Sequence, residues 1–86
     1  MYRFRLFIAD KTPRSTLATF NVKKICEENL KGHYELEVID LYQQPQLAKN
    51  DDVLAIPCLL RITPSPMRKI IGDMSNAAKT LAGIYA

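Results

Sequence analysis

The sequence predicts a single α/β domain in which helices cover a mixed sheet of four strands. Two observations lead to this prediction. A strand, a long helix and a second strand follow one another within residues 2–41, a pattern typical of a parallel strand pair joined by a right-handed crossover. Two short apolar runs then flank a turn marked by Pro64 and Pro66, which predicts an antiparallel hairpin.

The first half of the chain reads as a strand followed by a helix. Apolar residues alternate with arginines over residues 2–8, and the far end of this run is apolar on both faces, as in a buried central strand. Thr12 as N-cap and Pro13 at the first helical position begin the helix, and Gly32 ends it. The apolar face of this helix consists of Ala18, Val22, Ile25, Cys26 and Leu30.

The second half supplies the remaining elements. A second strand covers residues 34–41, and Pro45 begins a short helix that ends near Lys49. Pro57 cannot donate a ladder hydrogen bond, so it belongs at the start of the first hairpin strand, where both the cis and the trans isomer remain open. Gly72 ends the second hairpin strand.

Asp73 and Ser75 are alternative N-caps for a last helix that carries Ala77, Ala78, Leu81, Ala82 and Tyr85. The resulting order, βαβαββα over residues 1–86, is the thioredoxin-like architecture.

The composition narrows the class of protein. The chain has 86 residues, a hydrophobic fraction of 48% and a net charge of +3, which are values typical of one small globular domain. No apolar run approaches the ~20 residues of a membrane span, and no signal peptide is recognisable, so we expect a cytoplasmic protein without membrane partners. Basic residues alternate with acidic ones, so nothing supports binding of nucleic acid.

The residues expected for catalysis are missing. A thioredoxin-like redox enzyme holds its nucleophilic cysteine at the start of the first helix, where this chain has Ser15 and no cysteine. Cys26 and Cys58 are expected to be reduced, buried thiols rather than a disulfide. His33 is expected in a surface turn. Asp51 and Asp52 lack a third acidic ligand for a metal. We therefore expect no enzyme activity, no cofactor and no metal.

Four segments carry a resemblance to a known family, the circadian clock protein KaiB. They are residues 38–40 (Val-Ile-Asp), 44–48 (Gln-Pro-Gln-Leu-Ala), 55–57 (Ala-Ile-Pro) and 68–75 (Arg-Lys-Ile-Ile-Gly-Asp-Met-Ser). The Thr12-Pro13 helix start fits the same pattern, and the resemblance covers essentially the whole chain.

The resemblance implies a metamorphic protein with two folds. One is thioredoxin-like and monomeric, and it binds the ring-shaped ATPase KaiC, sequesters KaiA and competes with the sensor kinase SasA. The other is a ground state of order βαββααβ that assembles as a homo-oligomer, a tetramer or dimer. Tyr2 matches an aromatic residue at the KaiC contact, and Gly83 matches a glycine that tunes the two states. Pro57 and Gly72 fall in the half that would refold.

Several positions depart from the family pattern. The partner-contacting lysine of the second strand is Glu37, the basic first-helix positions are Leu17 and Phe20, and an acid of the last helix is Tyr85. These departures argue against KaiA as a partner. They favour a non-cyanobacterial homologue that serves a KaiC-like ATPase outside a complete clock.

Two alternatives stay open. One is a thioredoxin-like domain that senses redox state or peroxide through Cys58. The other is the KaiB-like sensor domain of a histidine kinase, expressed alone. We expect the end of the chain at Ala86 to argue against a complete kinase.

Overall fold

The computed structural model describes residues 1–9, 12–50, 53 and 55–86, which form four strands and three helices in the predicted order βαβαββα. The elements are β1 (Tyr2–Ile8), α1 (Pro13–Leu30), β2 (Tyr34–Asp40), α2 (Pro45–Asn50), β3 (Cys58–Thr63), β4 (Arg68–Ile71) and α3 (Ala77–Tyr85). The residues outside this description are Asp10, Lys11, Asp51, Asp52 and Leu54.

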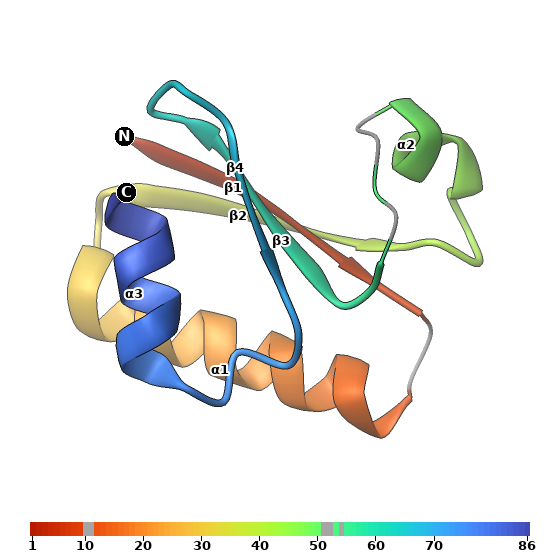
Figure 1. The fold of residues 1–86 in the computed structure, drawn as a ribbon, viewed down its shortest axis with the longest axis horizontal. Coiled ribbons are helices and arrows are strands. Elements are labelled where there is room, and N and C mark those ends of the chain that lie inside the picture. The colour runs from red at the N-terminus through yellow and green to blue at the C-terminus, as the bar shows by residue number, and fades with distance from the viewer. Residues whose placement is uncertain (10–11, 51–52, 54) are drawn as a thin grey trace.

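The sheet has the strand order β2-β1-β3-β4 (Figure 1). β1 pairs in parallel with β2, and α1 forms the crossover between them. β3 runs antiparallel to both β1 and β4, so the predicted hairpin is confirmed. The pairing of β1 with β3 shifts register between Arg3 and Phe4.

One face of the sheet is covered by α1 and α3 (Figure 1). The inward residues of β1 and β3 meet the apolar face of α1 predicted from the sequence, together with Ile84 of α3. The main buried members of this layer are Phe4, Leu6, Leu59, Val22, Ile25, Cys26 and Leu30. Burying these side chains supplies most of the favourable free energy of folding.

In the described part of the chain, side chains cover the opposite face at one end. Phe7, Ile39, Cys58 and Leu60 are buried there beneath Leu41, Leu47 and Val53, which flank or belong to α2. Toward the other end of this face, the exposed cross-strand ion pairs Arg3–Glu35 and Arg5–Glu37 lie over the sheet, with N–O distances of 3.4 and 3.2 Å.

The helix starts differ in how well the sequence predicts them. Thr12 caps α1 as expected, since its Oγ1 accepts a hydrogen bond from the main-chain N–H of Ser15 at 3.3 Å. The cap of α3 is Asn76, whose Oδ1 accepts from the N–H of Lys79 at 3.0 Å, so the prediction of Asp73 or Ser75 is wrong.

The reason lies in the turn before α3. Asp73 Oδ1 accepts the N–H of Ser75 at 3.0 Å, and Met74 adopts a positive φ of 61°. Because the side chain of Asp73 is bonded to Ser75 within this turn, it does not cap α3. The N-cap is therefore Asn76, one residue beyond Ser75. Within α3 the buried residues are Thr80 and Ile84, whereas Ala77, Ala78, Ala82 and Tyr85 are exposed and Leu81 is half-buried.

Three peptide bonds before proline are cis: Ile56–Pro57, Thr63–Pro64 and Ser65–Pro66. Pro57 directly precedes β3, as its missing N–H predicts. None of the helices in the described part of the chain has the length and apolar character needed to cross a membrane.

Candidate functional site

The corner between β1 and α1 is closed by Ser15. This side chain is buried, and its Oγ accepts a hydrogen bond from the main-chain N–H of Ala9 at 3.0 Å. The N–H of Ser15 in turn donates to Thr12. Ser15 thus acts in the first turn of α1 as a structural acceptor that ties this turn to the end of β1.

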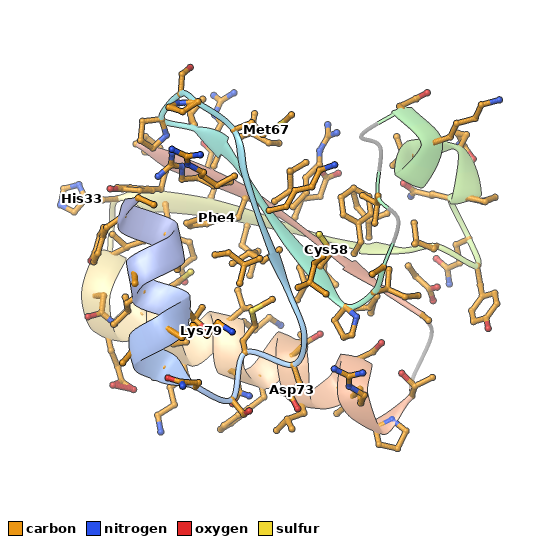
Figure 2. The ribbon with its side chains drawn as sticks, in the orientation of Figure 1. Phe4, His33, Cys58, Met67, Asp73 and Lys79 are labelled. Carbon is orange, nitrogen blue, oxygen red and sulfur yellow. The ribbon has the colours of Figure 1, made fainter. Side chains whose placement is uncertain are left out.

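Both thiols are buried and free, as the sequence predicts. Burial raises the pKa of Cys26 to about 11, with a further contribution from the neighbouring Glu27. Burial also raises the pKa of Cys58, although the charge of Lys69 opposes that effect. Cys58 is 1% exposed and lies within the sheet, whereas His33 points outward at the edge of the molecule (Figure 2).

The environment of Cys58 is unsuited to nucleophilic chemistry. A reactive thiol needs access and a lowered pKa, and Cys58 has neither. Within the described ranges no three His, Cys, Asp or Glu side chains lie close enough together to hold a metal ion.

The three residues that the family resemblance links to fold switching lie around β4: Pro57 directly before β3, Gly72 directly after β4 and Gly83 in α3. The main-chain N–H of Gly72 donates to the carbonyl oxygen of Pro57 at 3.0 Å, and Gly72 has a φ of +117° that favours glycine. Gly83 of α3 packs against the neighbouring Ile70, and a Cβ added at Gly83 would lie 2.8 Å from Ile70 Cδ1 and 2.9 Å from Cγ1. Gly83 therefore permits a close approach of α3 to β4.

Tyr2 belongs to an aromatic cluster where the two ends of the chain meet (Figure 1). Its ring stacks on Phe4 with centroids 5.9 Å apart and meets Tyr85 edge-on at 6.2 Å. Tyr2 is half-buried and Tyr85 is exposed. The cluster thus presents aromatic surface from β1 and from the last turn of α3 together.

Glu37 does not lie with Tyr2. Tyr2 pairs in register with Tyr34, and Glu37 follows three residues later, so the two predicted contact residues point to opposite faces of the sheet. Glu37 accepts a hydrogen bond from Arg5 Nε at 3.2 Å and is exposed. On α1, Leu17 and Phe20 are exposed, Phe20 by 63%.

Sequence reasoning missed Arg61, which is buried in β3 with hydrogen bonds to the end of α3. Arg61 lies within a run of residues that is otherwise apolar in the sequence. Its position shares a face with the core residue Leu59, and a charged residue at such a position is the one sequence signal that could have marked it.

Comparison with protein families and curated proteins gives a consistent result. A family model described as the KaiB domain matches residues 5–85. A circadian clock oscillator protein KaiB from a Picosynechococcus strain is 47% identical over 83 residues, which are 96% of this chain and 80% of that protein. The protein of the same name from Thermostichus vulcanus is 45% identical, over 96% of this chain and 77% of its own length.

Solved structures share the same fold. The N-terminal domain of SasA from Synechococcus elongatus has a TM-score of 0.78 and 25% identity, covering 98% of this chain and 82% of that domain. Mitochondrial thioredoxin 3 from Saccharomyces cerevisiae also has a TM-score of 0.78, at 20% identity, over 98% of this chain and 76% of its own. The fold is therefore thioredoxin-like, as predicted.

Proposed function

Since this chain belongs to the KaiB family, we propose that it is a non-enzymatic regulatory protein that binds a KaiC-like ATPase ring in the cytoplasm. The observation that carries the proposal is 47% identity, over 96% of the chain, to a protein named as a circadian clock oscillator. The regulation it serves is circadian or related to stress.

The chemistry of the site supports a role in binding rather than catalysis. The hydroxyl of Ser15 accepts a main-chain hydrogen bond, and both thiols are buried with raised pKa values. These features disfavour a redox or peroxide-sensing role for Cys58, because such a role needs an accessible thiolate.

The likeness to the SasA domain supports a second candidate, a sensor domain of the kind found in that protein. Both candidates have the same consequence at the molecular level, which is docking of a thioredoxin-like domain on a partner. They differ in whether the chain works as a separate regulator or as the input domain of a kinase.

The proposed contact surface includes Tyr2 and the adjacent Tyr85. Aromatic residues at the centre of an interface often account for much of the binding energy. The opposite face, with Glu37 and Arg5, is a second contact region in this proposal, and its acidic residue makes KaiA the weaker candidate as a further partner.

The proposal is tested by titrating a KaiC-like ATPase ring with this chain and three variants. Tyr2→Ala should weaken binding at least tenfold, which corresponds to about 1.4 kcal/mol. Tyr2→Phe should bind like wild type, because it keeps the ring that contacts Phe4 and Tyr85. Tyr42→Ala removes an exposed aromatic residue beyond β2 and serves as the matched control.

Thermal unfolding of each variant shows whether it remains folded. Absence of binding by wild type would refute the proposed function. Equal affinities of wild type and a folded Tyr2→Ala variant would refute the contact at Tyr2 alone.

The proposal extends to fold switching through Pro57, Gly72 and Gly83 and to a homo-oligomeric ground state, a dimer or tetramer. Sedimentation velocity over micromolar concentrations measures this directly. Monomer at every concentration would mean that the chain rests in the thioredoxin-like state.

A further inference from the structure

Arg61 is a charged residue in the interior of the domain. It lies in the middle of β3, opposite Phe4 of β1 and Arg68 of β4, and it is 2% exposed. The guanidinium of arginine carries a positive charge in proteins. A buried charge of this kind is costly unless hydrogen bonds compensate it, so the partners of Arg61 decide its effect.

Its partners are main-chain oxygen atoms from two separate segments. Nη1 donates to the oxygen of Ile84 at 2.7 Å and to that of Ala86 at 2.6 Å, both at the C-terminal end of α3. Nη2 donates to the oxygen of Pro66, in the turn between β3 and β4, at 2.6 Å. Figure 1 shows the end of α3 and this turn at the same edge of the molecule.

The positive guanidinium of Arg61 and the main-chain oxygen atoms that it contacts have complementary charges. The last carbonyl groups of a helix lack partners within the helix and carry partial negative charge, which a cation stabilises. The planar guanidinium can bridge carbonyl groups in two directions at once, which the single ammonium of lysine cannot do in the same geometry. Arg61 Nε has no hydrogen-bond partner among the described residues, so Nη1 and Nη2 alone supply the compensation.

We propose that Arg61 is a latch that couples α3 to the β3–β4 turn, so that the two segments open and close as one unit. When α3 leaves the sheet, Arg61 loses two of its three acceptors and becomes accessible to water, which competes with the carbonyl oxygen of Pro66 for the guanidinium. Release of the helix therefore releases the turn. The proposal rests on these contacts alone and does not depend on the proposed function.

Native-state hydrogen exchange tests the latch in the wild-type protein. The amides of α3 and those of Arg68 and Lys69 at the start of β4 should share one opening reaction, with the same dependence on denaturant. That opening should be more frequent than the global unfolding reported by amides in β1 and β2.

Three variants test the role of the side chain itself. Arg61→Lys and Arg61→Met should each accelerate exchange in α3 and at the start of β4 by a similar factor of at least ten, with exchange in β1 and β2 changed much less. Arg68→Lys, the exposed residue directly opposite on β4, is the matched control and should leave exchange unchanged.

The outcomes separate clearly. Acceleration in α3 without the start of β4, equal acceleration in every element, or no change in the Arg61 variants would each overturn the latch. If Arg61→Met does not fold, exchange in the Arg61→Lys variant and in the wild-type denaturant series still decides whether α3 and the start of β4 open together.

Discussion

At the scale of single residues, the buried thiols make the stability of the domain depend on pH in the alkaline range. Cys26 has a pKa of about 11 in the folded protein, above its ordinary value of 9.0. The unfolded chain therefore loses this proton first as pH rises. The stabilisation of the folded state that comes from the protonated Cys26 thiol is complete below pH 9 and is lost between pH 9 and about 11.

We expect the free energy of unfolding to fall over this range in wild type and to fall less steeply in Cys26→Ala. Denaturant titrations at several pH values measure the slope, which is independent of any constant loss from the smaller side chain. Parallel slopes in the two proteins would contradict a raised pKa for this thiol. We also expect both thiols to be alkylated slowly in the folded protein, because they are buried and their pKa values are raised.

Gly83 illustrates how packing opposes local helix propensity. Alanine in place of a helical glycine gains about 1 kcal/mol from propensity alone. Here the new Cβ would lie 2.8 Å from Ile70 Cδ1, so Ile70 must move. We expect Gly83→Ala to gain little or to lose stability in the wild-type background.

The same substitution in an Ile70→Ala background should gain the full ~1 kcal/mol, because both obstructing atoms are absent. A double-mutant cycle measured by urea unfolding gives the coupling between the two positions. Additive effects would mean that α3 approaches β4 less closely than the structure shows.

At the scale of elements, the start of α3 depends on Asn76. Removing an N-cap side chain typically costs about 1 kcal/mol, so Asn76→Ala should lower the free energy of unfolding by that amount. Ser75→Ala, at a position the sequence offers as a cap, should cost less than ~0.5 kcal/mol. Urea unfolding compares them, and a larger effect at Ser75 would place the cap one residue earlier.

Most element boundaries follow from local signals. Thr12 and Pro13 start α1, and Pro57 and Gly72 bracket the hairpin, because each of these residues acts on the backbone next to it. The cap of α3 could not be predicted in this way. Three residues of capping type occur within four positions, and only the path of the chain through Met74 selects Asn76.

The candidate site is less predictable because its contacts are distant in sequence. The hydrogen bond from Gly72 to Pro57, the packing of Tyr2 on Tyr85 and the bonds of Arg61 to the end of α3 all join separate elements. The sequence identifies some of these residues by family resemblance or by unusual type. It does not specify which of them meet.

At the scale of the whole molecule, fold and family make different contributions to the proposed function. The same arrangement of sheet and helices occurs in a thioredoxin and in the SasA domain, so the fold by itself is compatible with redox chemistry and with binding. The KaiB family assignment and the buried thiols of raised pKa favour the binding role that we propose.

The most direct test of the central claim is a competition measurement. A labelled N-terminal domain of a SasA-type kinase is bound to a KaiC-like ATPase ring, and this chain is added in increasing amounts while fluorescence anisotropy is followed. If the chain is a regulator that docks in its thioredoxin-like state, it should displace the labelled domain completely, and Tyr2→Ala should require at least tenfold more protein. Unchanged anisotropy at saturating concentrations of the folded chain would contradict the account.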